Sequence, residues 1–426
     1  MKDALPTSLI EVQKLRVGMF IHLDVGWIAH PFPLSSFKIS SVDQIATIRG
    51  LGKPQIRWCP DKSDPPPADT APDVAASPVQ ATEAAPETPQ AAQARHHREA
   101  LAASRSRLLL CERQFAEATR SCRQAAELVA SQPERAREQT EALTRAIVDK
   151  MLGEQEMCIR LLTDGAGDKA SHHAVNVSII SLLMGRTFGL SDSEMMDLGV
   201  GALMHDVGKL ELPERVRHRE ENFTVAETQF YQEHVTHGVA QARRMGLQPG
   251  AALVIAQHHE HADGSGFPLR LNSDRMTIAS RIVALVNRYD NMCNPHVPSR
   301  ALTPHEALSL LFAQGKNRYD TAILGAFIRM MGVYPPGSAV QLTDDRYALV
   351  MSVNSSRPLK PTVLVHDPKV PRGEALPLSL ENNTRLGIRR SLKPQQLPGE
   401  TLAYLSPRPR ISYYFEPQVE PEDMVS

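Results

Sequence analysis

The residues with the clearest chemical potential in this chain are histidines, one of which adjoins an aspartate. His205-Asp206 is followed by Gly208 and Lys209, and the adjacent pair His258-His259 lies downstream. A neighbouring imidazole and carboxylate offer a nitrogen and an oxygen donor at one point of the chain, which suits a divalent transition metal, and a carboxylate can bridge two metals. The sequence therefore predicts a metal site around His205 and Asp206.

A single histidine on an apolar helix is usually a core or surface residue that binds no metal. Here histidines occur on four separate segments beside apolar runs, and buried polar groups need partners. Histidines that face one interior find those partners most easily by binding metal, so we expect several of them to be ligands. The histidines of this region are His172, His173, His205, His234, His237, His258, His259 and His261.

Helices must position these side chains, and their end signals are clear. Capping boxes, with Ser or Thr followed three residues later by Glu, begin at Ser191, Thr224 and Thr303. Gly246 suits a helix C-terminal cap, and Pro249 suits the first turn of the next helix. The expected helices are Val175 to Phe188, Met195 to His205, Ala226 to Met245, Ala251 to His259 and Ile278 to Met292.

The first half of the chain divides by composition. Apolar residues largely alternate between Val12 and Leu23, which predicts a small N-terminal accessory domain of α/β or β type over residues 1–60, either a sensing or docking unit or a structural cap. Residues 61–97 are rich in Pro, Ala, Thr and Glu and are interpreted as a disordered linker. Residues 98–162 form an amphipathic helical region, interrupted near Pro133, that is either a spacer or a coiled-coil contact for a homodimer.

After residue 335 the sequence pattern changes from helices to short strands. Residues 336–406 are expected to be a small β-containing extension, with strands at residues 340–342, 347–353 and 362–365 and a turn at Asp344-Asp345. The last segment, residues 407–426, contains several prolines and is expected to be a flexible tail.

Composition excludes several classes of protein. A net charge of -1 over 426 residues gives no strong attraction to nucleic acid polymers or to anionic membranes. The 5 cysteines are scattered and lack CxxC spacing, which favours free thiols in a reducing compartment. No apolar run is long enough to cross a bilayer, and the N-terminus has no signal-peptide core, so we expect a cytoplasmic protein without membrane insertion.

Several short motifs follow one another in order over residues 163–335. They are His173 to Val177, Gly201 to Lys209, His234 with Gly238, His258 to Glu260, Asp263 to Pro268, Arg281-Ile282 and Tyr289-Asp290. Together they resemble the HD-GYP family, a branch of the HD superfamily of metal-dependent phosphohydrolases. Residues 8–62 also resemble the small domain often placed before HD-GYP domains. The resemblance implies a mainly α fold, with an HD-type helical bundle around a dinuclear metal site.

The resemblance implies a bacterial signalling enzyme that hydrolyses cyclic di-GMP to pGpG, with further hydrolysis to GMP in some members of the family. It implies two divalent metal ions, with iron or manganese expected and nickel or zinc as alternatives. Asp206 would bridge the two metals, and diguanylate cyclase domains are implied as partners. The implied ligands are His173, His205, Asp206, His234, His258, His259 and, at a position that differs from the family, Asn287.

Two further groups are candidates for the reaction. Lys209, one turn after His205, could hold a phosphate oxygen as a point charge, so Asp206 and Lys209 are the predicted catalytic residues. The loop that contains Gly264, Gly266, Phe267 and Pro268 could approach a substrate closely, or it could be only a tight connector between helices.

Two positions depart from the family pattern. Asn287 stands where the family has a metal-binding Asp, and it offers an oxygen without a charge. Asp290 follows three residues later, about 60° away around the helix, where it could compensate in part. Phe267 replaces the tyrosine of Gly-Tyr-Pro, which keeps the ring and loses a hydroxyl.

Three functions are therefore open from the sequence. The first is an active cyclic di-GMP phosphodiesterase. The second is a degenerate HD-GYP module that binds cyclic di-GMP or a diguanylate cyclase partner without turnover, which Asn287 favours. The third is a phosphohydrolase of another nucleotide.

Overall fold

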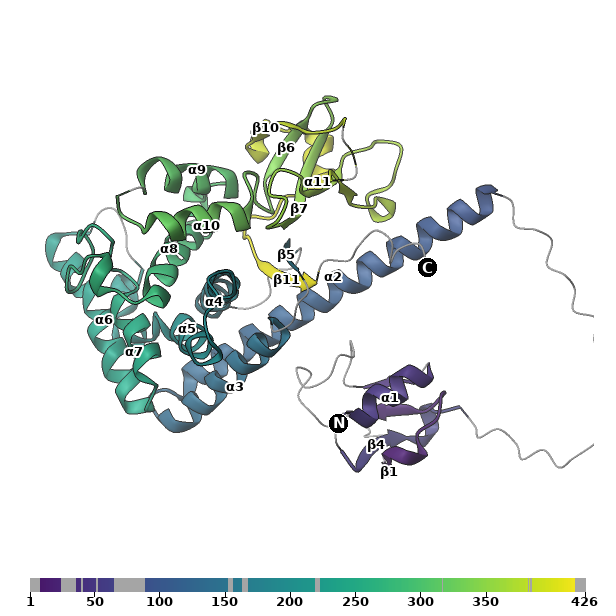
Figure 1. Cartoon of the computed structure of the whole chain (residues 1–426), viewed down its shortest axis with the longest axis horizontal. Helices are drawn as coiled ribbons and strands as arrows, with labels where there is room; N and C mark the ends of the chain where they lie inside the picture. The colour runs from purple at the N-terminus through teal and green to yellow at the C-terminus, as the bar shows by residue number, and fades with distance from the viewer. Residues whose placement is uncertain are drawn as a thin grey trace, which may run out of the picture. The chain divides into compact units, whose positions relative to one another are not determined.

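A computed structural model describes residues 8–23, 36–39, 41–50, 53–64, 89–151, 156–162, 168–218, 223–315, 317–381, 383 and 385–417. The chain divides into two compact units, residues 1–94 and residues 95–426 (Figure 1).

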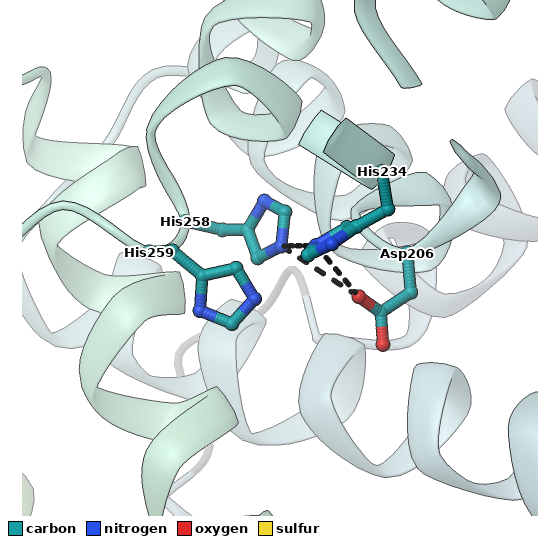
Figure 2. A group of neighbouring side chains, drawn as sticks. All are labelled: Asp206, His234, His258 and His259. Carbon is teal, nitrogen blue, oxygen red and sulfur yellow. Dashed lines mark hydrogen bonds and ion pairs between the residues drawn. The ribbon is translucent and has the colours of Figure 1, made fainter. Parts of the chain in front are cut away.

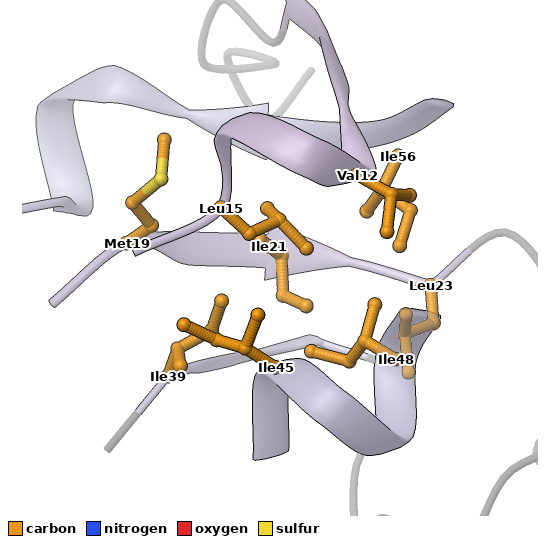
Figure 3. Close-up of a cluster of buried hydrophobic side chains, with 9 residues drawn as sticks. All are labelled: Val12, Leu15, Met19, Ile21, Leu23, Ile39, Ile45, Ile48 and Ile56. Atoms are coloured by element: carbon orange, nitrogen blue, oxygen red, sulfur yellow. The ribbon is translucent and has the colours of Figure 1, made fainter. Parts of the chain in front are cut away.

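The N-terminal unit is an antiparallel sheet with one helix, α1 (Val42–Gly50). The strand order is β1 (Ser8–Glu11), β4 (Gln55–Cys59), β2 (Phe20–His22) and β3 (Ser36–Lys38). Apolar side chains from the strands, from α1 and from the turn after β1 meet in one core (Figure 3). The members of this core are Val12, Leu15, Met19, Ile21, Leu23, Ile39, Ile45, Ile48 and Ile56.

The predicted strand pattern between Val12 and Leu23 is only partly right. Val12–Lys14 form a short 3-10 helix, Val17 is 44% exposed, and the strand is limited to Phe20–His22. The chain turns at Gly18, which has a φ of 91°. Residues on either side of this turn reach the same core without belonging to one strand.

Two long helices follow, and the interruption between them lies next to Pro133, as the sequence predicted. They are α2 (Pro89–Leu128) and α3 (Pro133–Met151). The helix α2 begins inside the segment expected to be a linker, while residues 65–88 of that segment lie outside the described residues. The expected helical region also ends in a strand, β5 (Met157–Leu161).

The helical bundle confirms the predicted fold class, and each expected helix is present. The three predicted capping boxes form at Ser191, Thr224 and Thr303, and Gly246 caps α6 in the left-handed conformation. The helix α4 is buried along most of its length and packs against α5 and α8. The helices are α4 (Lys169–Thr187), α5 (Asp192–Met204), α6 (Val225–Met245), α7 (Pro249–Gln257), α8 (Ile278–Cys293), α9 (Pro304–Gln314) and α10 (Thr321–Met331).

A second antiparallel sheet follows, and the three strands predicted after residue 336 are confirmed. Its main path runs through β10 (Ile388–Leu392), β6 (Ala339–Leu342), β7 (Tyr347–Asn354), β5 and β11 (Tyr413–Pro417). The strand β8 (Thr362–Val365) pairs with β7 and with β9 (Leu378–Ser379). A short helix, α11 (Gly399–Leu405), lies before the last strand. Asp345, with a φ of 69°, lies in the turn predicted between β6 and β7.

Two expectations about this sheet are wrong. The strand β5 precedes the helical bundle in the chain, so the extension is not built from residues 336–406 alone. The described part of the predicted flexible tail contains β11, which pairs with β5 and buries Tyr413, Tyr414 and Phe415. Burial of three aromatic side chains outweighs the local effect of the nearby prolines. Residues 418–426 lie outside the described residues.

Each helix in the described ranges is too short or too polar to span a bilayer.

Candidate metal centre

Two groups of potential ligands meet in the helical bundle and share one carboxylate. The first consists of Asp206, His234, His258 and His259, and the second consists of His173, His205 and Asp206. Within each group the ligand atoms lie within 4.8 Å of one another. Figure 2 shows the first group, with His234 and His258 directed at Asp206. The structure therefore brings together six of the seven predicted ligands in two neighbouring groups, and the seventh, Asn287, contacts His173.

Three of the histidines are oriented by the same local device. In His205, His234 and His258 the Nδ1 atom lies 2.7, 2.5 and 2.8 Å from the backbone carbonyl oxygen three residues earlier. A carbonyl oxygen only accepts, so Nδ1 carries the proton and Nε2 carries a lone pair. This arrangement fixes each ring with its lone-pair nitrogen, Nε2, toward the shared aspartate.

His173 is oriented by a carboxylate instead. Its Nδ1 atom lies 2.5 Å from Oδ2 of Asp290, and its Nε2 atom lies 3.2 Å from Nε2 of His205. The side-chain amide oxygen of Asn287, Oδ1, lies 3.1 Å from the same Nε2 atom. Asp290 therefore supports His173 from the far side of the ring, whereas Asn287 lies on the side of the cluster.

The carboxylate of Asp206 lies between the two groups. Its Oδ1 atom is 3.7 Å from Nε2 of His234 and 3.6 Å from Nε2 of His258. Its Oδ2 atom is 3.4 Å from Nε2 of His205 and 3.9 Å from Nε2 of His173. Because one oxygen faces each group, the carboxylate has the geometry of a bridging ligand.

Burial keeps most of these imidazoles neutral, which is the form that binds metal. It lowers the pKa of His234 from 6.5 to about 3, and it also lowers the pKa of His205 and of His259. For His173 burial acts in the same direction, but the hydrogen bond to Asp290 outweighs it and raises the pKa. Burial opposes ionisation of Asp206, yet the charge of Lys209 and the nearby imidazoles hold the pKa of that carboxyl well below its usual value.

The donor set fits a divalent cation for a specific reason. The Nε2 atoms of His234 and His258 face each other at 3.3 Å, although both rings already use their proton at Nδ1. Two lone pairs at this distance repel unless a cation lies near both. Among the described residues, Oδ1 of Asp206 and Nε2 of His259 are also buried without a hydrogen-bond partner. Such atoms are costly unless a ligand satisfies them.

Close contact between two backbones brings Asp206 to His234. The short 3-10 helix η4 (Val207–Glu211) packs against α6. A Cβ atom on Gly208 would lie 1.9 Å from the carbonyl oxygen of His234 and 2.3 Å from the backbone nitrogen of Gly238. Only glycine permits this approach.

Lys209 supplies a positively charged side chain next to Asp206. Its Nζ atom donates to Oδ2 of Asp206 at 2.6 Å and lies 5.4 Å from the centre of the Tyr231 ring. Burial opposes its charge, but Asp206 outweighs burial and raises the pKa of Lys209. Lys209 therefore remains protonated beside the bridging carboxylate at neutral pH.

The glycine-rich loop after α7 is held against the ligands. The ring of Phe267 stacks on His259 with centroids 4.5 Å apart, and a Cβ atom on Gly266 would lie 2.5 Å from the carbonyl oxygen of His259. The buried carboxylate of Glu260, whose role the sequence analysis missed, accepts hydrogen bonds from the backbone nitrogens of Leu269 and Leu271 at 2.6 and 2.8 Å. Gly264 has a φ of 76°, and Pro268 is exposed.

Three histidines of the region belong to neither group. His172 is buried and bonds to Ser412, His237 lies on the surface 4.0 Å from Glu233, and His261 bonds to Ser265. Lys169, one turn before His173, donates to the backbone of His296.

Comparisons with known proteins agree with this geometry. A family model described as an HD domain matches residues 123–323, and a model described as a domain of unknown function, DUF3391, matches residues 8–143. A Pseudomonas aeruginosa protein named as a cyclic di-GMP phosphodiesterase is 24% identical over 362 residues, which cover 84% of this chain and 84% of the relative.

Other relatives match a smaller part. A Borreliella burgdorferi cyclic di-GMP phosphodiesterase is 23% identical over 53% of this chain and 60% of its own length. A Xanthomonas campestris cyclic di-GMP phosphodiesterase response regulator is 29% identical over 36% of this chain and 41% of its own length. The solved structure of a Bdellovibrio bacteriovorus protein matches 76% of this chain and 98% of its own length at 14% identity, with a TM-score of 0.44. Residues 123–323 therefore match an HD domain, and over most of its length the chain is similar to a relative named as a cyclic di-GMP phosphodiesterase.

Proposed function

We propose that this protein is a metal-dependent phosphodiesterase that hydrolyses cyclic di-GMP, with pGpG or GMP as the product. The observation that carries the proposal is the arrangement of two histidine groups around the shared carboxylate of Asp206. The relatives named as cyclic di-GMP phosphodiesterases support the substrate.

Each group of ligands would hold one divalent cation. His173, His205 and Asp206 would hold the first, with Asn287 as a neutral oxygen ligand, and the remaining histidines together with Asp206 would hold the second. Nitrogen and carboxylate donors suit iron or manganese, with nickel and zinc as alternatives. Such a pair supplies Lewis acidity toward a phosphodiester and lowers the pKa of water, so that a nucleophile is available near neutral pH.

The chain's own residues contribute positioning and charge. Asp206 would hold its charged carboxylate between the two histidine groups. Lys209 would turn from Asp206 toward a phosphate oxygen of the substrate. The loop with Gly264, Gly266, Phe267 and Pro268 would line the substrate's approach, because Phe267 already contacts the ligand His259.

One observation favours a second function. Asn287 brings no charge to the His173 side, so the first cation would be held less tightly. A chain that cannot retain this cation would bind cyclic di-GMP, or a diguanylate cyclase domain, without turnover. Residues 98–162, which include most of α2 and all of α3, remain our proposed contact for a homodimer.

Chromatography of reaction products tests the proposal. Protein loaded anaerobically with iron or manganese should convert cyclic di-GMP to pGpG or GMP, and the Asp206→Ala variant should not. Absence of product from folded, metal-loaded protein would favour the binding module. Parallel incubation with 3′3′-cGAMP, the substrate named for a Vibrio cholerae relative that is 32% identical over 28% of this chain, would expose a different nucleotide specificity.

A further inference from the structure

The C-terminal strand reaches the metal centre from a part of the sequence far from the ligands. Residues 411–413 run beside α4 and α8, and β11 continues along β5. Asn176, Asp290, Ser412 and Tyr413 are each no more than 1% exposed. The contact is therefore part of the bundle interior.

Two asparagines connect this segment to the support of His173. Nδ2 of Asn294 donates to Oδ1 of Asp290 at 2.9 Å and to the carbonyl oxygen of Ile411 at 2.8 Å. Oδ1 of Asn294 accepts from the backbone nitrogen of Ile411 at 2.8 Å. Asn294 thereby joins the strand and the carboxylate through one side chain.

Asn176 makes the second connection. Its Nδ2 atom also donates to Oδ1 of Asp290, and its Oδ1 atom accepts from the backbone nitrogen of Tyr413 at 2.9 Å. Both asparagines thus bond to the same oxygen of Asp290, which leaves Oδ2 for Nδ1 of His173 at 2.5 Å. The direction of the carboxylate, and with it the direction of His173, depends on where residues 411–413 lie.

Other contacts of the segment bond to residues outside the two ligand groups. Oγ of Ser412 bonds to Nε2 of His172 at 2.7 Å, and the Tyr413 hydroxyl bonds to that of Tyr289 at 2.9 Å and to the carbonyl oxygen of Pro336 at 3.2 Å. These bonds hold the strand on the bundle. Removal of either hydroxyl leaves in place the backbone nitrogens that donate to Asn294 and Asn176, so these positions supply matched control variants.

We propose that residues 411–413 are a positioning element of the metal centre, which orients the ligand His173 through Asn176, Asn294 and Asp290. The inference rests on the two-metal site proposed above. The C-terminal sheet is thereby mechanically coupled to one metal of the pair, because the ligands of the other, His234 and His258, are oriented by their own helices. Displacement of β11 releases the metal on the His173 side and leaves the other in place.

The test compares Asn294→Ala with Tyr413→Phe and Ser412→Ala in the full chain loaded with manganese. Metal content and the electron paramagnetic resonance spectrum are measured after the fold has been checked by circular dichroism. The wild type and both control variants should hold two ions per chain with the signal of a coupled pair. Asn294→Ala should fall toward one ion per chain, with the signal of an isolated ion and an affinity about 10- to 100-fold lower for the lost one.

A coupled pair with unchanged affinity in Asn294→Ala would overturn the inference and leave the proposed function standing. Equal loss of metal in all three variants would also overturn it, because the strand would then act only through stability. A wild type that holds the pair but yields no product would contradict the proposed function alone.

Hydrogen exchange of the wild type covers the case in which Asn294→Ala does not fold. Manganese should slow exchange of the amides of Ile411 and Tyr413, because both donate to the asparagines. Unchanged exchange at these two amides would count against the inference.

Discussion

The side-chain oxygen of Asn287 lies 3.1 Å from Nε2 of His173, the ring atom that faces the cluster, and Nδ2 of Asn291 donates to the same oxygen at 2.6 Å. The oxygen is thus placed as a ligand would be, and a neighbouring amide fixes it there. What the position lacks is charge. Asp290 does not replace that charge within the cluster, because its carboxylate lies behind His173.

Replacement of Asn287 by Asp should therefore strengthen binding of the metal on the His173 side. An anionic oxygen in the same place attracts a divalent cation more strongly, and we expect roughly tenfold tighter binding, or about 1.4 kcal/mol. Isothermal titration with manganese measures the effect. Turnover that appears only in Asn287→Asp would show that the natural chain is one charged ligand short, and unchanged affinity would remove Asn287 from the ligand set.

Two histidines one turn apart on α6 give a matched test of the other group. His234 is fully buried with Nε2 3.7 Å from Asp206, whereas His237 lies at the surface beside Glu233. His234→Ala should lose one metal per chain and all turnover. His237→Ala should keep both metals and its turnover, and its free energy of unfolding should stay within about 0.5 kcal/mol of the wild-type value. Metal analysis and product chromatography measure the two effects. Retained metal in His234→Ala would contradict the assignment of His234 as a ligand.

Lys209→Met should separate catalysis from metal binding. The lysine pairs with Oδ2 of Asp206 at 2.6 Å, so its removal frees the carboxylate and should not weaken metal binding. Loss of a positioned cation should lower kcat about 100-fold. Steady-state kinetics and metal content are measured together, with Lys209→Arg as the charge-preserving control. Wild-type kcat in Lys209→Met would exclude the proposed role.

The metal-free protein should lose stability in mild acid. Burial lowers the pKa of His234 from 6.5 to about 3, so between these values the unfolded chain binds more protons than the folded one. Stability is then complete above pH 6.5 and falls as the pH decreases, by about 1.4 kcal/mol per pH unit for each such histidine. His205 and His259 act in the same direction, whereas His173, whose pKa is raised, affects the pH dependence only above pH 6.5, where its contribution to stability falls as the pH rises.

Urea unfolding of the metal-free chain at several pH values between 4 and 7 measures this dependence. The His234→Gln variant should reduce the slope by the equivalent of one proton. An identical slope in the variant would mean that His234 does not titrate between the two states as its burial implies.

Gly208→Ala should disturb both stability and the site. The added methyl group would lie 1.9 Å from the backbone of His234, and neither backbone can move without shifting a ligand. We expect a loss of about 1–3 kcal/mol and weaker binding of both metals. Gly325→Ala in α10, where the nearest atom is the end of the Arg329 side chain at 3.6 Å, should be neutral or slightly stabilising. Thermal unfolding with and without manganese compares the two.

The sequence by itself determined the helices and the set of candidate ligands. Capping boxes at Ser191, Thr224 and Thr303 and the apolar periodicity act within a few residues, so the predicted helices of the bundle are confirmed with only small differences at their ends. His-Asp and His-His pairs offer metal donors whatever the surrounding fold. Their occurrence on separate helices predicted a helical bundle around a metal site, and the resemblance to the HD-GYP family implied a second metal.

Only the tertiary structure decided which side chains support those ligands. The contacts of Asn294 and Asn176 with residues 411 and 413 span 117 and 237 residues, and no local pattern encodes a pairing at such distances. The same holds for β5 and β11, which pair across the whole bundle, and for Gly208, whose need for glycine arises only when η4 meets α6. Helix signals act over one or two turns, whereas the orientation of His173 and the pairing of β11 with β5 depend on burial between distant segments.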